Sequence, residues 1–355
     1  MPNVPGLEAL QKYRTDIEAG LQQFFTSAPA LLGIEQSAHG EQALSRLENY
    51  CLRPAKRLRG SLAALAYDDA AGTNKSPIAI QAAVILELMQ GYLLIVDDAM
   101  DRSALRRGEA TIHELYKSDG MNAHDADMIA INTGLLAQHL ASLQLATVHV
   151  PSEVLVRAMQ VMQRNIAVTG FGQLEDIAAT LSVGVTEADI IRKYVQKSSF
   201  YTFVNPLQLG FTLAGVEDAT VFAACEKFGV AAGIAFQLHD DYLGIFGAAA
   251  DLGKSTLDDL REGKSTLLMH YALAQAEPTD VETLRRSLGD AKATDDDLHA
   301  VQAILRSCGA EEYCRSQALK YAQVAQSVLA TEAIGSVELQ AVLQAVVEYS
   351  VTRDK

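Results

Sequence analysis

The amino-acid sequence predicts an all-α protein, a bundle of about a dozen helices. Apolar residues recur with helical periodicity along most of the chain, and Gly and Pro punctuate these segments. No segment shows the period-two alternation of a half-buried strand, and no alternation of strands and helices is evident. Several expected helix starts have a Thr with an acidic residue three positions later, the pattern of a capping box, as at Thr186, Thr279 and Thr294.

The length of the chain allows one large domain or two. Its 355 residues are 49% hydrophobic, which is ample for a large core. No segment resembles a linker or a low-complexity region, and no repeat of fixed period is present. We therefore expect a single domain over residues 1–355, with the chemically informative part at about 50–270 and the C-terminal helices as scaffold.

Net charge and cysteine spacing exclude some classes of function. The formal net charge is −15, whereas a general nucleic-acid-binding protein would be basic, so no nucleic acid is expected as a partner. An anionic substrate stays open, because local basic patches decide that. The four cysteines lack Cys-x-x-Cys spacing, and the N-terminus lacks the pattern of a signal peptide. We expect reduced thiols, no zinc site and a cytoplasmic protein.

One long apolar helix that ends in acid organises the chain. Residues 78–96 are nineteen mostly apolar residues, and Asp97, Asp98 and Asp101 follow them. Asp97 and Asp101 share a face, because residues four apart on a helix point the same way. Carboxylates this close repel and should raise one another's pKa values. The cluster is either a solvated helix end or a site for a strong cation, and oxygen ligands alone favour Mg²⁺ shared with substrate phosphates.

The same helix is long enough to cross a membrane. Gln81, Glu87 and Gln90 interrupt its apolar residues, and the aspartates end it. Ionisable residues are costly within a membrane span, so we interpret the segment as a buried core helix and expect no membrane span.

A second acidic cluster lies far along the chain. Gln237, Asp240 and Asp241 stand at positions i, i+3 and i+4 of an expected helix and share one face. The two clusters belong either to unrelated solvated faces or to two helices that face each other across a bundle. In the second case they would present both clusters to a group of Mg²⁺ ions with a diphosphate between them.

Basic residues suited to phosphate occur in short runs of this acidic chain. Arg offers a planar fork to phosphate oxygens, and Lys offers a point charge. Any one of them alone is an ordinary surface charge, but Arg106 and Arg107 closely follow the first acidic cluster. The set comprises Lys56, Arg59, Arg106, Arg107, Lys197 with the adjacent Ser198, Lys254 and Lys264.

In this order the motifs resemble those of the trans-isoprenyl diphosphate synthases, and most of all the short-chain members that make geranylgeranyl diphosphate. A lone Asp-Asp-x-x-Asp motif would be weakly specific, whereas so many motifs in one order are strongly so. The resemblance covers roughly residues 50–270, through segments 56–59, 97–101, 105–108, 172–176, 197–203, 236–241, 253–254 and 259–264. It implies a helical isoprenoid synthase fold around a deep apolar cavity.

The resemblance also implies roles for the acidic residues. Asp97 and Asp101 match the first metal-binding motif of the family and Asp240 matches the second, and together they would hold three Mg²⁺ ions on an allylic diphosphate. Asp98 and Asp241 would act as nearby or water-mediated partners. Mg²⁺ and basic side chains would stabilise the departing diphosphate while isopentenyl diphosphate attacks the allylic cation.

The remaining roles concern the two diphosphate substrates. The allylic diphosphate would be held by Arg106, Lys197 and Lys254. Isopentenyl diphosphate would be held by Lys56, Arg59 and Arg107, with Gln90 facing it two helical turns before the acidic cluster. Gln237 would orient the allylic substrate, and the resemblance adds two more substrate-binding positions, Ser198 and Lys264.

The second metal motif departs from the family pattern in two places. Its last position is Gly244 where Asp is usual, and a common Phe-Gly-Asp reads Phe246-Gly247-Ala248. Gly at the first of these positions is familiar in some bacterial members that make twenty-carbon products, so we do not interpret it as lost activity. Losing both acids would weaken the third Mg²⁺ site, and it leaves open a weakly catalytic or non-catalytic subunit that supports a partner synthase.

Product length depends in the resembled family on the fifth and fourth residues before the first Asp, here Tyr92 and Leu93. An aromatic residue followed by a smaller one resembles synthases that stop at twenty carbons, so we expect geranylgeranyl diphosphate. Farnesyl diphosphate, or a longer product, is the alternative, and Tyr92 is otherwise a core aromatic packed elsewhere.

A class I terpene cyclase would share the fold and the metal chemistry. It needs an aromatic-lined cavity and one diphosphate site, but aromatic residues are only 6% of the chain, Trp is absent and the second basic set would have no use. The synthase is therefore the preferred interpretation. The family further suggests a homodimer, which apolar helix stripes fit.

Overall fold

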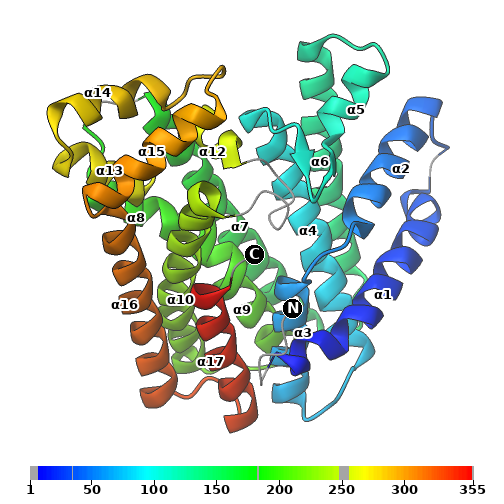
Figure 1. Ribbon diagram of the computed structural model, residues 1–355. Helices are drawn as coiled ribbons and strands as arrows, with labels where there is room; N and C mark the ends of the chain where they lie inside the picture. The colour runs from blue at the N-terminus through cyan, green and yellow to red at the C-terminus, as the bar shows by residue number, and fades with distance from the viewer. Residues whose placement is uncertain (1–6, 34, 182–183, 248–255, 354–355) are drawn as a thin grey trace. The chain divides into compact units, whose positions relative to one another are not determined.

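The structure is a computed structural model, and it describes residues 7–33, 35–181, 184–247 and 256–353. The described chain is almost entirely helical (Figure 1), which confirms the predicted all-α class. In chain order the helices are α1 (Glu8–Leu32), α2 (Ala38–Leu52), α3 (Leu58–Ala71), α4 (Pro77–Asp101), α5 (Ile112–Ser118), α6 (Ala123–Ala146), α7 (Ser152–Leu181), α8 (Glu187–Tyr194), the π-helix η1 (Val195–Val204), α9 (Asn205–Leu213), α10 (Ala219–Phe246), α12 (Thr256–Glu262), α13 (Leu267–Gln275), α14 (Pro278–Ser287), α15 (Asp295–Ser307), α16 (Ala310–Thr331) and α17 (Val337–Thr352).

A small antiparallel hairpin follows α4. Its strands are β1 (Leu105–Arg106) and β2 (Glu109–Ala110). Arg107 and Gly108 form the two-residue turn between them, with φ values of 56° and 79°, as tight hairpins require. Two residues per strand are too few to show an alternating pattern, so the sequence predicted no strand here.

Contacts within the chain define two compact units. The first contains Met1–Met162, Pro206–Glu217 and Gly335–Val342, and the second contains Gln163–Asn205, Asp218–Ile334 and Leu343–Lys355. The single domain that we expect from the sequence stays a prediction.

In the first unit, α4 packs against α3 and α6. Its residues 82–89 are buried without a break, so the apolar segment forms a core helix as the sequence predicts. Gly134 on α6 permits the close packing, since a Cβ there would lie 2.7 Å from Val96 Cγ2. Buried on the same helix, Glu87 accepts a hydrogen bond from Arg57 at 3.0 Å, which explains a charge within the apolar run.

In the second unit, α10 packs against α16 and η1. By length and composition both α10 and α4 are apolar enough to cross a membrane, yet 50% and 61% of their most apolar windows are buried within the protein. Such burial is typical of core helices. The acidic cluster on α10 lies two turns before its end, and η1 carries Lys197 and Ser198. A π-helical segment is uncommon and frequently marks a functional site.

Candidate active site

The first acidic cluster lies at the end of α4, and hydrogen bonds fix its middle residue, Asp98. The Asp98 side chain is 1% exposed and has a hydrogen-bond donor on each oxygen. Tyr50 donates its hydroxyl to Oδ2 at 2.5 Å, and Arg106 donates to Oδ1 from Nε at 2.8 Å and from Nη2 at 2.5 Å. Asp97 lies 3.8 Å from Arg106 Nη2 and is 19% exposed. The structure thus brings Asp97, Asp98 and Arg106 together.

Burial raises the pKa of Asp98, and the Arg106 guanidinium opposes this rise. The charge of Asp97 also raises that pKa, but it is the last of the causes. The sequence predicted that neighbouring carboxylates would raise one another's pKa values; Asp97 does so at Asp98, where burial has the larger effect. Asp101, the last residue of α4, is half-buried.

The hairpin that carries Arg106 and Arg107 is held from the end of α2. Arg53 donates to the carbonyl oxygens of Arg106 at 3.3 Å and of Ala110 at 2.8 Å. It also pairs with Glu109 at 3.3 Å. Because Arg53 is only 4% exposed, these bonds fix the backbone of both strands. The orientation of two predicted phosphate-binding arginines therefore depends on a third arginine that the sequence did not single out.

The basic turn before α3 is fixed in a similar way. Arg57 has a φ of 53° at the N-cap of α3, a conformation that residues other than Gly rarely adopt. Its buried guanidinium bonds Glu87 and, at 3.2 Å, the carbonyl oxygen of Arg53. Lys56 before it is exposed and Arg59 after it is half-buried. Buried Arg57 therefore supports a turn on which the two predicted ligands of isopentenyl diphosphate stand.

Further up α4 lie the residues predicted to contact substrate or limit its length. Gln90, Tyr92 and Leu93 are all half-buried. Burial raises the pKa of the Tyr92 hydroxyl, so it stays neutral. Their roles stay predictions.

The second unit also has an acidic pair, Asp240 and Asp241, in which one Asp accepts a hydrogen bond from a Tyr hydroxyl. Asp241 accepts a hydrogen bond from the Tyr194 hydroxyl and another from Gln237 Nε2 at 2.8 Å. Ser198 Oγ in turn donates to Gln237 Oε1 at 2.5 Å. Burial raises the pKa of Asp241 to about 6. Gln237, Ser198 and Asp241 are thus brought together, and the neighbouring Asp240 is 42% exposed and contacts Arg353.

Lys197 pairs with Asp176, an acidic residue of α7. Its Nζ donates to Asp176 Oδ2 at 2.6 Å, and Lys193 Nζ donates to the other oxygen at 2.8 Å. Lys193 also bonds the carbonyl oxygen of Ser265 at 2.7 Å. Burial would raise the pKa of Asp176, but the two ammonium groups hold it below its ordinary value. Lys193 therefore ties the segment beside Lys264 to α7.

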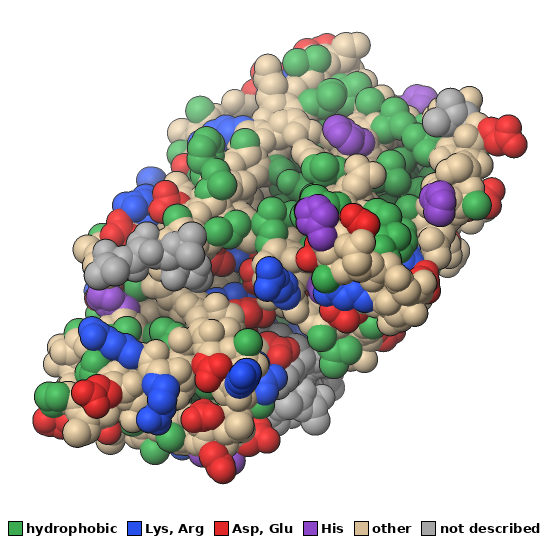
Figure 2. Space-filling view, turned by 90° about the horizontal axis from the view of Figure 1, so that it is seen from above, with side chains coloured by type: hydrophobic (Ala, Val, Ile, Leu, Met, Phe, Trp, Pro, Cys, Tyr) green, Lys and Arg blue, Asp and Glu red, His purple; other side chains and the backbone are tan. Residues whose placement is uncertain are grey.

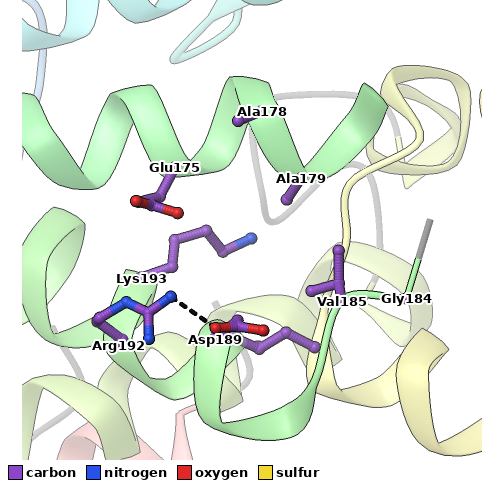
Figure 3. Close-up of a pocket in the computed structure, with 9 residues that line it drawn as sticks. Glu175, Ala178, Ala179, Gly184, Val185, Asp189, Arg192 and Lys193 are labelled. Atoms are coloured by element: carbon purple, nitrogen blue, oxygen red, sulfur yellow. Dashed lines mark hydrogen bonds and ion pairs between the residues drawn. The ribbon is translucent and has the colours of Figure 1, made fainter. Parts of the chain in front are cut away.

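A pocket of about 200 Å³ lies between α7 and α8 (Figure 3). Glu175 and Ala178 line it from α7, and Asp189, Arg192 and Lys193 from α8. Arg192 pairs with Asp189 at 2.6 Å, and Lys193 is committed to Asp176. The pocket is lined by none of the residues predicted to bind substrate, so we assign no diphosphate to it.

Gly244 has a structural reason to lack a side chain. A Cβ at this position would lie 1.8 Å from Asp259 Oδ2. The carboxylate of Asp259, from α12, thus fills the space of a side chain at 244. Lys264 lies 4.0 Å from the same carboxylate and pairs with Glu262 at 2.6 Å. Ala248 and Lys254 lie outside the described residues.

The acidic residues fit Mg²⁺ in their chemistry. Within the described ranges, no three His, Cys, Asp or Glu side chains gather into a metal cage. Mg²⁺ is usually held by one or two carboxylates, with substrate phosphates and waters completing its shell. Asp97 and Asp101 on α4, and Asp240 on α10, offer carboxylate oxygens alone. Each cluster, taken by itself, offers donors that suit a cation shared with a phosphorylated substrate.

Several residues of these networks were not found from the sequence. Lys193 could have been found, because it stands four residues before Lys197 and so shares a helix face with it. Tyr50, Arg53 and Arg353 carry no such signal, since each meets its partner across a long stretch of sequence.

Comparison with known proteins gives consistent results. A sequence model of the polyprenyl synthetase family matches residues 41–305. The geranylgeranyl diphosphate synthase of Saccharolobus solfataricus is 28% identical over 302 residues, which are 84% of this chain and 87% of that protein. The geranylfarnesyl diphosphate synthase of Aeropyrum pernix is 30% identical over 300 residues, covering 84% and 91%.

The fold is similar to that of solved structures. Geranylgeranyl pyrophosphate synthase from Corynebacterium glutamicum, solved with isoprenyl diphosphate and magnesium, aligns with a TM-score of 0.89 and 28% identity. The alignment covers 97% of this chain and 99% of that one. The isoprenoid synthase fold expected from the sequence is therefore confirmed.

Proposed function

The chain belongs to the polyprenyl synthetase family and is a polyprenyl diphosphate synthase, and we propose that it condenses isopentenyl diphosphate with allylic diphosphates to make geranylgeranyl diphosphate. The reaction is a prenyl transfer. A new carbon–carbon bond forms at the allylic carbon, the allylic diphosphate leaves and one proton is lost.

One observation carries this proposal, the shared construction of the two acidic pairs. In each pair one Asp is bonded to a Tyr hydroxyl, Asp98 to Tyr50 and Asp241 to Tyr194. Its neighbour, Asp97 or Asp240, is partly exposed, with 19% and 42% of the side chain accessible. A fixed carboxylate beside an exposed one suits an exchangeable cation better than a permanent structural ion.

Three partly exposed carboxylates are the proposed metal ligands. Asp97, Asp101 and Asp240 would hold three Mg²⁺ ions, whose charge would neutralise the departing diphosphate. Asp98 holds Arg106 through two hydrogen bonds, so Arg106 is oriented before substrate arrives, and prior orientation is a main source of electrostatic catalysis.

The basic residues divide between the two substrates. Arg106 and Lys197, with Lys254, hold the allylic diphosphate while its bond to carbon breaks. Lys56, Arg59 and Arg107 hold isopentenyl diphosphate so that its double bond meets the allylic carbon. Gln90 contacts the same substrate, and the proton leaves to the released diphosphate. The buried apolar surface of α4 excludes water that would quench the allylic cation.

Asp259 supports an active synthase over a non-catalytic subunit. The supporting subunit was considered because acids are missing at both Gly244 and Ala248, and Ala248 lies outside the described residues. Since a carboxylate from α12 occupies the space of a side chain at Gly244, the second cluster keeps an acid there. We infer that Asp259 takes the place of the usual last Asp of the motif.

Product length is the finest part of the proposal. Tyr92 is half-buried on α4, which supports a role as the floor of the chain pocket. The alternative is farnesyl diphosphate or a longer product. The Aeropyrum relative, for example, is named a geranylfarnesyl diphosphate synthase. A Tyr92→Ala variant should lengthen the product, and an unchanged product would remove Tyr92 from this role.

The test is a product assay. Purified protein is incubated with Mg²⁺, isopentenyl diphosphate and separately the five-, ten- and fifteen-carbon allylic diphosphates, and products are sized by mass spectrometry. We expect a twenty-carbon product that is lost with EDTA and in Asp97→Ala. Folded protein that yields no product with any starter would contradict the proposal and favour a supporting subunit.

We also propose a cytoplasmic homodimer. In the second unit, Phe171 and Leu174 on α7 are 63% and 62% exposed, and in the first unit Val156 on α7 is 54% exposed. On the face drawn in Figure 2, hydrophobic side chains likewise gather in patches. Exposed apolar patches commonly mark contacts between proteins.

A further inference from the structure

Asp240, a proposed metal ligand, is engaged by a cation of the chain itself. Arg353, which directly follows α17, donates from its guanidinium Nη2 to Asp240 Oδ1. The Arg353 side chain is 8% exposed, whereas that of Asp240 is 42% exposed. The arginine is thus the buried partner, and the carboxylate keeps a side that solvent reaches.

Two further contacts hold Arg353 against the same face of α10. Its guanidinium carbon lies 4.3 Å from the centroid of the Phe236 ring, within cation–π range. Its backbone carbonyl oxygen accepts a hydrogen bond from His239 Nε2 at 2.7 Å. Phe236, His239 and Asp240 stand at i, i+3 and i+4 and so form one face. Three residues of this face thus contact one arginine, two of them at its guanidinium and one at its backbone carbonyl.

The two acidic clusters differ in where their arginine binds. In the first cluster Arg106 bonds the buried Asp98 at 2.5 Å and stays 3.8 Å from the more exposed Asp97. In the second cluster Arg353 bonds Asp240, whose side chain is 42% exposed, and half-buried Asp241 is bonded by Tyr194. The arginine of the second cluster therefore bonds the proposed metal ligand directly, whereas the hydrogen bonds of Arg106 go to Asp98.

We propose that Arg353 is the resident cation of the second acidic cluster and that Mg²⁺ competes with it for Asp240. This inference rests on the proposed function, which makes Asp240 a metal ligand. A guanidinium and a divalent cation that share one carboxylate repel each other, so Mg²⁺ on either oxygen of Asp240 weakens the contact with Arg353. Arg353 then sets how much Mg²⁺ the second cluster requires, and it is a positioning residue of the reaction.

Mg²⁺ affinity tests the proposal without reference to product. Full-length wild type, Arg353→Ala, Arg353→Lys and Arg315→Ala are titrated with MgCl₂ by calorimetry, with and without inorganic pyrophosphate. Arg315, on α16, is the matched control, because its guanidinium lies 5.5 Å from the ring of Tyr242, which is on α10 like Asp240. Removing it takes one positive charge from the surroundings of α10 and leaves the contact between Arg353 and Asp240 in place.

We expect Arg353→Ala to bind Mg²⁺ about threefold to tenfold more tightly than wild type, because no arginine competes for Asp240. Arg353→Lys should lie between the two, since Lys keeps the charge but loses the planar fork. Arg315→Ala should match wild type. Equal affinities of wild type and Arg353→Ala would overturn the proposal, and so would an equal gain in Arg315→Ala. If Arg353→Ala does not fold, Arg353→Gln replaces it.

A double-mutant cycle shows whether the effect passes through Asp240. In an Asp240→Asn background, the substitution Arg353→Ala should leave Mg²⁺ affinity unchanged, and a full gain there would overturn the proposal. Product formation is measured separately on the same proteins. If Arg353→Ala raises Mg²⁺ affinity as predicted but the wild type makes no product, the result would support the role of Arg353 and contradict the proposed reaction.

Discussion

At the scale of single residues, the site depends on two carboxylates that each accept a hydrogen bond from an uncharged Tyr. Asp98 and Asp241 are each bonded to a Tyr hydroxyl, and burial raises the pKa of both Tyr50 and Tyr194 well above the ordinary value. These tyrosines therefore remain donors. A Tyr supplies one hydrogen bond and no charge, so it fixes the carboxylate without competing as a cation for the neighbouring Asp.

Tyr50→Phe should loosen the first cluster. The substitution leaves a buried Asp98 oxygen without its donor, which costs about 1–3 kcal/mol of unfolding free energy. Because Asp98 also holds Arg106, we expect a larger fall in kcat than a rise in KM for isopentenyl diphosphate. Chemical denaturation and steady-state kinetics measure the two effects. Tyr116→Phe, at a buried Tyr whose ring lies 3.8 Å from the Arg46 guanidinium, is the control, and equal effects of both substitutions would contradict the role of Tyr50.

Gly244→Asp should harm the protein although it restores the usual family motif. The new Cβ would lie 1.8 Å from Asp259 Oδ2, and two carboxylates would compete for one space. Overpacking of this kind costs about 1–3 kcal/mol of unfolding free energy, and activity should fall with it. Gly170→Asp is the control, because nothing lies within 4 Å of a Cβ at that position.

The combined variant Gly244→Asp with Asp259→Gly distinguishes the role of the acid from mere crowding. If the two carboxylates are interchangeable, the double variant should regain stability and much of its Mg²⁺-dependent activity. Full activity in the single variant Asp259→Gly would show that the carboxylate of Asp259 supplies nothing.

At the scale of elements, long periodic segments could be predicted and short ones could not. The apolar run of α4 indicated a core helix because residues 82–89 had no polar face to expose other than Glu87. The hairpin of β1 and β2 and the seven-residue helices α5 and α12 are too short to show a period. The π-helical geometry of η1 leaves no pattern in its residues. Within the site, spacing placed Gln237 and Asp241 on one face, but partners such as Tyr50 depend on how distant segments pack.

The junction of α3 and α4 should depend strongly on one buried ion pair. The side chains of Arg57 and Glu87 are each 1% exposed, and Glu87 also accepts from Gly60 N at 3.2 Å. Glu87→Gln removes the close carboxylate partner of the buried arginine, whose other acidic neighbour, Glu18, lies at 3.9 Å, so we expect a loss of about 3–5 kcal/mol of unfolding free energy. Since Arg57 supports the turn between Lys56 and Arg59, KM for isopentenyl diphosphate should also rise.

A surface pair provides the comparison for Glu87→Gln. Arg164 and Glu226 are paired at 3.5 Å with side chains 56% and 41% exposed, and such pairs contribute about 0–1 kcal/mol. Glu226→Gln should therefore change the denaturation midpoint little. A similar small change in Glu87→Gln would show that the buried pair does not hold the junction.

At the scale of the whole molecule, the exposed apolar side chains of each unit predict self-association. In the second unit, Phe171, Leu174 and Ile177 recur every three residues of α7 and are 63%, 62% and 40% exposed, so they form one stripe. In the first unit, Met128 and Leu135 on α6 stand seven residues apart and are 47% and 40% exposed. We expect a second copy of the chain to cover such surfaces, because a two-fold symmetric dimer pairs the same surface of both copies.

Phe171→Glu combined with Leu174→Glu should break this association. Light scattering should give wild type a mass twice that of the 38.2 kDa chain, and the double variant should shift to the mass of one chain, because two carboxylates would have to be buried without partners. Val337→Glu is the matched control, since Val337 is 77% exposed at the start of α17 and lies outside the stripe. A wild type with the mass of one chain would contradict the prediction. Dissociation by Val337→Glu to the same degree would show that added charge, and not loss of the α7 stripe, separates the copies.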